Sequence, residues 1–351
     1  MKYWARKHTM TGIKTRKMDN LHHDNLCMQL AIDEAWKYQG LTYPNPAVGA
    51  AITYNGKIIS IEAHQKAGSA HAEILVLLSA YEVLSGNTID FNKFDASSAH
   101  DFLLDLYLGF FSDCTIYVTL EPCSHIGKTP SCAQLLEKLH LQRVVVGTSD
   151  PIANHSGGSK LFANITMGVL EKECRDLIEP FVIWQKRAFV LFKLAQTSNG
   201  KIGGGYLSSK ASLKHVHQLR EACDTLLIGG NTVREDRPTL DCRFIDAKAP
   251  NIIIYSHEDN FDREIPLFDI PNREVTVSNN LEFLEQPSFV IVEGGEGMMR
   301  AIINQIDWLL LYQAPKISTN NVTYHAKMDL EFLHQSKKEI DITIWSRKIG
   351  N

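Results

Sequence analysis

The sequence predicts an α/β protein built from two domains. The chain has 351 residues, enough for two domains on length alone. Helix and strand signals alternate through the first half, and a second alternating series starts near Phe189 with different motifs. We therefore expect a boundary near residues 170–185. It would separate a basic tail and a first domain (1–20 and 21–175) from a second domain (176–351).

Composition and charge limit the classes of partner. Hydrophobic residues make up 44% of the chain and charged residues 22%, as in ordinary globular proteins. The net charge of −4 gives no general affinity for polyanions, and no apolar run is long enough for a membrane helix. We therefore expect neither nucleic acid nor a membrane as a partner.

Two further features indicate the compartment. The first 20 residues are basic and lack the apolar core of a secretion signal, so we expect a frayed tail, with Met18 as an alternative start. The seven cysteines then favour a reducing cytoplasm and thiolate chemistry over a disulfide framework.

Local patterns place the elements of the first domain. Asn55-Gly56 is typical of a two-residue hairpin turn, so the apolar runs on either side of it are expected to pair as strands. The expected strands are 47–54, 57–63, 115–120 and 143–147. The expected helices are 25–38, 71–84 and one from Cys132 to about His140, with a surface excursion at 86–112.

The second domain shows the same alternation after a connecting helix at 171–187. Its strands are expected at 189–195, 225–229, 251–255, 289–292, 308–313 and 341–346. Its helices are expected at 209–223 and 297–305. This alternation is typical of a second α/β domain.

One histidine, two cysteines and one glutamate form the clearest chemical signal. His71 and Glu73 lie at the start of a predicted helix. Cys123 follows a predicted strand in Glu121-Pro122-Cys123, and Cys132 opens the next helix. A catalytic zinc takes three protein ligands and leaves one position for water. In this order the residues match the signature of zinc deaminases, whose glutamate moves protons and does not bind the metal.

We therefore expect His71, Cys123 and Cys132 to hold Zn²⁺. Glu73 would act as general acid and base on a water activated by the metal. Taken singly, the cysteines could be unpaired thiols, and a purely structural zinc would require a fourth protein ligand. Gly127-Lys128-Thr129 is not part of a P-loop, because Pro122 stands where that pattern requires glycine.

The loop between the two cysteines indicates a family. It runs Cys123-Ser-His-Ile-Gly127-Lys128-Thr129-Pro130-Ser-Cys132, with Tyr43-Pro44-Asn45-Pro46-Ala47-Val48-Gly49 upstream and Ala70-His71-Ala72-Glu73 between. The second half adds Lys193-Leu-Ala195, Asn199-Gly200-Lys201, the run from Ile228 to Leu240, and Glu293-Gly294-Gly295. From about residue 25 to the C-terminus the chain resembles the bifunctional riboflavin-biosynthesis deaminase–reductase family.

The resemblance implies a fold, a reaction and ligands. The fold would be a cytidine-deaminase-like α/β/α domain followed by a dihydrofolate-reductase-like α/β domain. The first domain would deaminate 2,5-diamino-6-ribosylamino-4(3H)-pyrimidinone 5′-phosphate. The second would then reduce the ribosyl group to ribityl with NADPH. Such a chain acts on a small phosphorylated pyrimidine and is expected to form a homo-oligomer.

The resemblance also implies contact residues in both domains. Along NADPH it places Ala195, Thr232, Asp236, Gly294 and Gly295. Along the substrate it places Asn45, Lys128, Arg220, Leu240, Arg243 and Glu293. The paired glycines remove side chains where the backbone approaches a phosphate. The two arginines are bidentate donors suited to a sugar phosphate.

Three positions depart from the family pattern and leave alternatives open. Asn199 stands where the family has aspartate, Leu213 where it has arginine, and Gly203–Tyr206 is shorter than in many relatives. One alternative is a zinc deaminase of another nucleoside or a tRNA base with an inactive reductase-like module. Another is a non-enzymatic paralogue. The lack of a basic stretch interleaved with aromatic residues argues against a nucleic-acid substrate.

Overall fold

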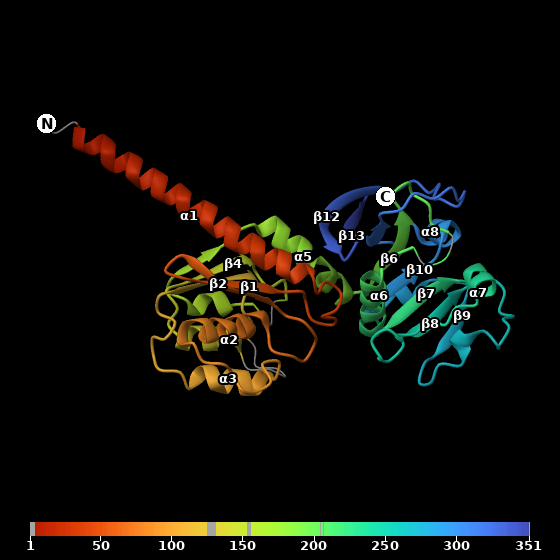
Figure 1. Ribbon diagram of the computed structural model, residues 1–351, viewed down its shortest axis with the longest axis horizontal. Coiled ribbons are helices and arrows are strands. Elements are labelled where there is room, and N and C mark those ends of the chain that lie inside the picture. The colour runs from red at the N-terminus through yellow and green to blue at the C-terminus, as the bar shows by residue number, and fades with distance from the viewer. Residues whose placement is uncertain (1–3, 125–130, 153–155, 204, 206, 351) are drawn as a thin grey trace. The chain divides into compact units, whose positions relative to one another are not determined.

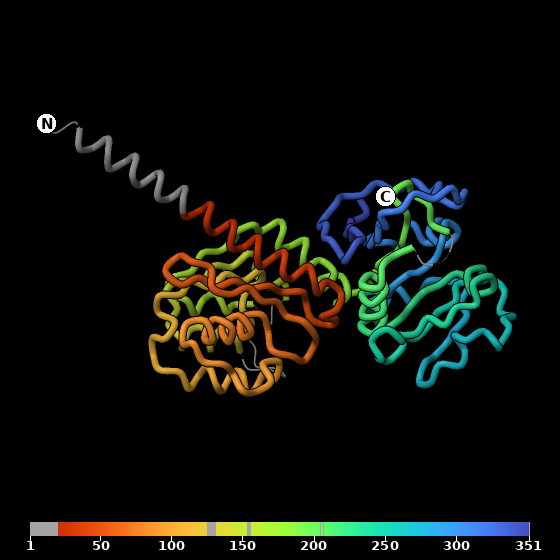
Figure 2. The backbone as a smooth tube through the Cα atoms, in the orientation of Figure 1, coloured from red at the N-terminus to blue at the C-terminus, as the bar shows by residue number. Residues whose placement is uncertain are grey.

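The computed structural model describes residues 4–124, 131–152, 156–203, 205 and 207–350, with side chains from residue 20 onward. The backbone divides into two units, Met1–Glu179 and Pro180–Asn351 (Figure 1, Figure 2). Each unit is a sheet with helices packed against it, so the α/β class expected from the sequence is confirmed.

The first unit contains a five-stranded sheet of order β2-β1-β3-β4-β5. Its strands are β1 (Gly49–Tyr54), β2 (Lys57–Ala63), β3 (Cys114–Leu120), β4 (Arg143–Thr148) and β5 (Ile165–Met167). β1 runs antiparallel to β2 and β3, whereas β3, β4 and β5 are parallel. Asn55 and Gly56 have φ of 49° and 78°, both positive as a type I′ turn requires. The predicted hairpin is therefore confirmed.

Helices cover both faces of this sheet (Figure 1). They are α1 (Trp4–Trp36), α2 (Ala72–Ser85), α3 (Ala96–Leu104), α4 (Cys132–Lys138) and α5 (Glu171–Trp184), with a 3₁₀ turn at Gly158–Leu161. α1 packs so closely on β1 that a Cβ added at Gly49 would stand 1.9 Å from the Ala31 carbonyl oxygen. α5 lies against the same face, where a Cβ at Gly147 would stand 2.2 Å from the Cys174 Sγ. α2, α3 and α4 enclose a hydrophobic cluster on the opposite face.

The first helix is longer than the sequence indicated. α1 begins at Trp4, whereas a frayed tail to residue 20 and a helix at 25–38 were expected. The added stretch contains no proline and only one glycine, so a helix that packs on the sheet farther along can extend into it. Hydrophobic periodicity did not predict this extension. A periodic signal requires an apolar helix face, and this basic stretch lacks one.

The second unit contains an eight-stranded sheet of order β12-β13-β11-β6-β10-β7-β8-β9. Its strands are β6 (Ala188–Thr197), β7 (Thr225–Gly229), β8 (Asn251–Tyr255), β9 (Val275–Ser278), β10 (Ser288–Glu293), β11 (Trp308–Ala314), β12 (Asp329–Lys338) and β13 (Asp341–Ile349). The strands from β11 to β9 are parallel, and β13 pairs antiparallel with both β11 and β12. The carboxyl ends of β6, β7 and β10 therefore lie at the same edge of the sheet. Ligands of parallel sheets bind at that edge.

The helices of this unit are α6 (Lys210–Ala222), α7 (Gly230–Asp236) and α8 (Glu296–Ile302), with 3₁₀ turns at Pro266–Phe268 and Glu282–Glu285. The sequence did not indicate α7, nor the strands β5, β9 and β12. All three of these strands lie at a sheet edge, where one flank faces solvent and the apolar pattern weakens. Within the described residues, no helix combines the length and apolarity needed to cross a bilayer.

Candidate functional site

Three potential metal ligands converge near the carboxyl end of β3. His71 is the N-cap residue of α2, Cys132 is the first residue of α4, and Cys123 lies just beyond β3. The His71 Nδ1 atom lies 3.9 Å from the Cys123 Sγ and 3.3 Å from the Cys132 Sγ. All three ligand atoms lie within 4.8 Å of one another. The fold thus gathers the residues that the sequence suggested as ligands, from segments up to 61 positions apart.

The donor set fits zinc. In a tetrahedral zinc site, bonds of about 2.1 Å to nitrogen and about 2.3 Å to sulfur separate those atoms by about 3.6 Å. That value lies between the two observed separations. The Cys132 backbone N–H donates to the Cys123 Sγ at 3.4 Å, which orients this sulfur. Hydrogen bonds from Cys132 and His71 also lower the pKa of the Cys123 thiol, which favours the thiolate that a metal requires.

Glu73 lies in the first turn of α2, beside the cluster. Its side chain is buried, and burial raises the pKa of its carboxyl above the usual value, although His71 acts in the opposite direction. A carboxyl with a raised pKa can both accept a proton and return it. Glu73 is absent from the ligand cluster that the described residues form. The geometry therefore suits it to proton transfer.

His64, which the sequence did not single out, orients Asn45. The buried His64 ring places its Nδ1 3.2 Å from the Ala70 carbonyl oxygen, so this nitrogen carries the proton. Nε2 is then the acceptor for the Asn45 Nδ2, at 3.1 Å. Burial lowers the pKa of His64 to about 4, which keeps the ring neutral. The Asn45 side-chain oxygen takes no part in this hydrogen bond. Lys128, the other contact expected in this unit, lies outside the described residues.

Glu121 anchors the segment that follows β4. Its carboxylate accepts backbone hydrogen bonds from Asp150 at 3.2 Å, Gly157 at 3.1 Å and Ser159 at 2.9 Å. Burial works against ionisation, but these hydrogen bonds hold the pKa of Glu121 below its usual value. The Glu121-Pro122-Cys123 motif thus combines a structural carboxylate with a potential metal ligand.

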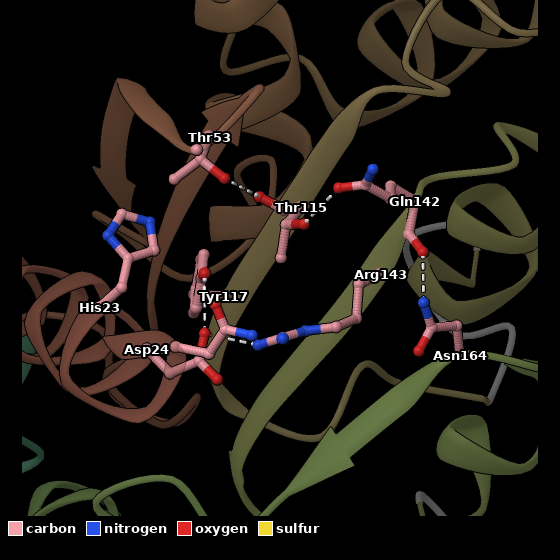
Figure 3. Close-up of a pocket in the computed structure, with 10 residues that line it drawn as sticks. His23, Asp24, Thr53, Thr115, Tyr117, Gln142, Arg143 and Asn164 are labelled. Carbon is pink, nitrogen blue, oxygen red and sulfur yellow. Dashed lines mark hydrogen bonds and ion pairs between the residues drawn. The ribbon is translucent and has the colours of Figure 1, made fainter. Parts of the chain in front are cut away.

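A polar hollow of about 490 Å³ lies between α1 and the amino-terminal ends of β3 and β4, away from the metal ligands (Figure 3). Arg143 reaches from β4 toward Asp24 of α1, and the ion pair is 2.5 Å long. The Tyr117 hydroxyl donates to Asp24 at 3.0 Å. Because these charged groups already pair with one another, we interpret the hollow as the place where α1 is fastened to the sheet.

A buried ion network lies at the end of β10 in the second unit. Glu293 accepts hydrogen bonds from the Arg220 Nε at 2.7 Å and Nη2 at 2.9 Å. The Lys193 Nζ lies 2.9 Å from the same carboxylate, because the two residues are in register on β6 and β10. Burial alone would raise the pKa of Glu293, but the two cations hold it well below its usual range. The sequence motif contains Lys193 but gave it no role.

Arg220 is largely occupied inside the protein. Besides its two bonds to Glu293, its Nη1 donates to the Asp241 carbonyl oxygen at 3.1 Å. Three of the five guanidinium N–H groups take part in these bonds, and no described residue accepts from the other two. The structure therefore shows that Arg220 joins Glu293 to the loop after α7. The phosphate contact expected from the resemblance stays a prediction.

The remaining expected contacts lie in β6, in α7 and in the loop that follows α7. Ala195 lies in β6, and Thr232 and Asp236 lie in α7. The Leu240 side chain is buried in a hydrophobic cluster, so only its backbone can face a ligand. Arg243 is half exposed and pairs with the neighbouring Asp241 at 2.8 Å.

Gly294 and Gly295 lie between β10 and α8 and differ in their surroundings. A Cβ at Gly294 would stand 2.6 Å from the Met298 Cβ, so glycine here lets α8 pack closely. A Cβ at Gly295 would meet open space, so the backbone there can approach a ligand.

The structure explains why asparagine stands at position 199, where the family has aspartate. Its Nδ2 donates to the Ser318 carbonyl oxygen at 2.8 Å, a bond that a carboxylate cannot make. Its Oδ1 accepts from the Thr197 hydroxyl at 2.7 Å and from the Ser318 backbone N–H at 3.2 Å. Asn199 therefore joins the end of β6 to the segment after β11. Leu213 lies in α6 with its side chain partly buried.

The fold and the two polar sites define a class of protein, in which a zinc-deaminase-like domain is joined to a reductase-like domain. Residues 21–148 match the family model of the cytidine and deoxycytidylate deaminase zinc-binding region. Residues 188–324 match the RibD C-terminal domain.

Individual relatives agree with both matches. The chain is 37% identical to the riboflavin biosynthesis protein RibD of Aquifex aeolicus over 70% of its own length and 64% of that protein. It is 32% identical to RibD of Actinobacillus pleuropneumoniae over 74% of its length and 66% of that protein. It thus spans just under two thirds of these relatives.

A solved structure covers more of the chain. The Thermotoga maritima diaminohydroxyphosphoribosylaminopyrimidine deaminase/5-amino-6-(5-phosphoribosylamino)uracil reductase is 26% identical and has a TM-score of 0.62. The match covers 94% of this chain and 100% of that one. The chain therefore belongs to the bifunctional riboflavin-biosynthesis deaminase–reductase family. The expected order of a cytidine-deaminase-like and a dihydrofolate-reductase-like domain is confirmed.

Proposed function

We propose that this chain catalyses two consecutive steps of riboflavin biosynthesis. The first is the hydrolytic deamination of 2,5-diamino-6-ribosylamino-4(3H)-pyrimidinone 5′-phosphate, and the second is the NADPH-dependent reduction of its ribosyl group to ribityl. The observation that carries the proposal is the cluster of His71, Cys123 and Cys132 with the buried Glu73 beside it. The substrate is inferred from the family.

In the first unit, His71, Cys123 and Cys132 would hold the zinc. A zinc ion in such a site supplies the Lewis acidity that activates a water molecule. Glu73 accepts a proton from the water and returns it to the departing amine, so that one water is consumed and one ammonia leaves. Asn45 orients the pyrimidine through its side-chain oxygen, which the hydrogen bond to His64 directs.

In the second unit, NADPH would supply a hydride to the ribosyl carbon. Ala195, Thr232, Asp236 and the turn at Gly294-Gly295 would lie along the cofactor, and the open space at Gly295 supports close backbone contact. Reduction also requires one proton. The Lys193 ammonium group, which lies 2.9 Å from Glu293, would supply it. Glu293 would accept hydrogen bonds from the sugar hydroxyls, and the two N–H groups of Arg220 that make no bond to described residues would donate to the phosphate.

The test is incubation of the purified protein with the diaminopyrimidine substrate, with and without NADPH. Ammonia release measures the first step, and NADPH oxidation that depends on prior deamination measures the second. Glu73→Gln should slow ammonia release by about 10²–10⁴-fold, the usual contribution of a general acid and base. Its zinc content should equal that of the wild type, because Glu73 is not a ligand. Ammonia release at the wild-type rate would contradict the mechanism.

We also propose that the chain works in a reducing cytoplasm as a homo-oligomer. All seven cysteines are free thiols. The edge strand β12 exposes 75% of Phe332, a surface suited to association between copies. Sedimentation at increasing protein concentration tests the assembly, and a monomer at every concentration would contradict it.

A further inference from the structure

The loop after α7 follows a backbone path that its own residues do not favour. Arg237 and Leu240 have φ of 44° and 54°, in the left-handed region where glycine is the usual residue. Such a path persists only where the surrounding structure holds it in place. This loop matters for the second site because Leu240 and Arg243 are both expected along the substrate.

Arg273 holds this loop through its carbonyl groups. Its Nη1 donates to the Leu240 carbonyl oxygen at 2.7 Å, and its Nη2 donates to those of Thr239 at 2.8 Å and Leu267 at 2.6 Å. Burial lowers the pKa of Arg273 to about 10, so the guanidinium is still charged at neutral pH. Hydrogen bonds from a charged donor are stronger than neutral ones.

The other flank of the same loop is tied to Glu293. The Asp241 carbonyl oxygen accepts from Arg220, whose other donors grip the Glu293 carboxylate. The Pro238 carbonyl oxygen accepts from the Leu267 backbone N–H at 3.1 Å. Four successive carbonyl groups, from residue 238 to residue 241, are therefore all engaged by donors outside the loop. Without Arg273, the Leu267 and Arg220 bonds would still hold the carbonyl groups of Pro238 and Asp241, but those of Thr239 and Leu240 would lose their donor.

We propose that Arg273 is a positioning residue for the reduction step. It holds the loop at 237–243 so that the Leu240 backbone and Arg243 keep a fixed place relative to Glu293. The inference rests on the function proposed above and adds a residue that does not itself contact the substrate.

Arg273→Met tests this role, with Arg263→Met as a matched control. Arg263 is exposed, lies on the same segment and stacks its guanidinium 4.6 Å over the Phe268 ring. Among the described residues it makes no hydrogen bond to the loop at 237–243. If about one molecule in ten of Arg273→Met holds the loop in place, the KM of the reduction step rises about tenfold while kcat changes little. Ammonia release by the first unit should be unchanged. Hydrogen exchange of the amides at 237–243 should be faster in Arg273→Met and unchanged in the control.

The conservative variant Arg273→Lys keeps the charge but offers one ammonium group in place of a fork, so an intermediate KM is expected. If Arg273→Met does not fold, Arg273→Lys decides by the same two measurements. Unchanged KM and exchange would overturn the proposal, and so would faster exchange with an unchanged KM. A wild-type chain that never oxidises NADPH would refute the proposed function instead, and the exchange data would still show whether Arg273 holds the loop.

Discussion

Replacing Glu293 with glutamine tests what holds the second unit together. The carboxylate neutralises Arg220 and Lys193, whose side chains are only 11% and 17% exposed. Glutamine keeps the shape but leaves both cations without a counter-charge. Removing one partner of a buried ion pair typically costs about 3–5 kcal/mol. Because glutamine retains one acceptor oxygen, we expect the lower end, about 3 kcal/mol.

This loss is large enough to measure by calorimetry. In a domain of this size each kcal/mol shifts Tm by about 2–4 °C, so the transition of the second unit should fall by about 6–12 °C. Arg243→Met is the matched control, since its ion pair with Asp241 involves a side chain that is 54% exposed. Such pairs contribute about 1 kcal/mol at most. A shift for Glu293→Gln no larger than that of the control would refute the reasoning.

The ionisation of Glu293 also predicts how the Tm difference between wild type and Glu293→Gln depends on pH. The pKa of Glu293 is held well below the value of about 4.3 that the unfolded chain has. Its contribution to stability is therefore complete above the unfolded pKa and is lost as the pH falls through the folded one. The Tm difference between wild type and Glu293→Gln should be constant between about pH 7 and pH 5 and shrink only below about pH 4.

Three other substitutions have distinct expected results. Cys132→Ser should leave little zinc bound after dialysis and abolish ammonia release, while reduction of a deaminated substrate continues; retention of stoichiometric zinc would contradict the ligand assignment. Gly49→Ala should cost about 2 kcal/mol or more in urea unfolding of the first unit, because the new Cβ would stand 1.9 Å from the Ala31 carbonyl oxygen. An unchanged urea midpoint would show that α1 can move away freely. Asn199→Asp should cost about 1–3 kcal/mol, because the Ser318 carbonyl oxygen loses its donor and faces a charge instead. Stability equal to that of the wild type would mean that this bond contributes nothing.

Most of the first unit could be predicted because its signals are local. Asn55-Gly56 specifies a turn through its own backbone preferences, and the apolar runs around it form strands. The order of His71, Cys123 and Cys132 indicated a metal cluster because ligand chemistry depends on residue type. The helix before residue 20 was missed because a polar stretch has no apolar face, and its backbone continues a helix that packs elsewhere.

In the second unit, the edge strands could not be predicted for a similar reason, because their own sequences carry little signal. β12 has exposed residues along its length, and its pairing with β13 places it in the sheet. A strand whose stability comes from its neighbour carries little of that information in its own sequence.

Residue types and their spacing were thus enough to indicate two α/β domains, a zinc ligand set and a glutamate for proton transfer. They could not indicate that His64 orients Asn45, or that Lys193 and Arg220 share Glu293. Those contacts join residues 19 to 100 positions apart, and strand register and chain packing alone bring them within hydrogen-bonding distance. The types and spacing of the site residues can be read from the sequence. The partner of a buried charge depends on which segments the folded sheet places side by side.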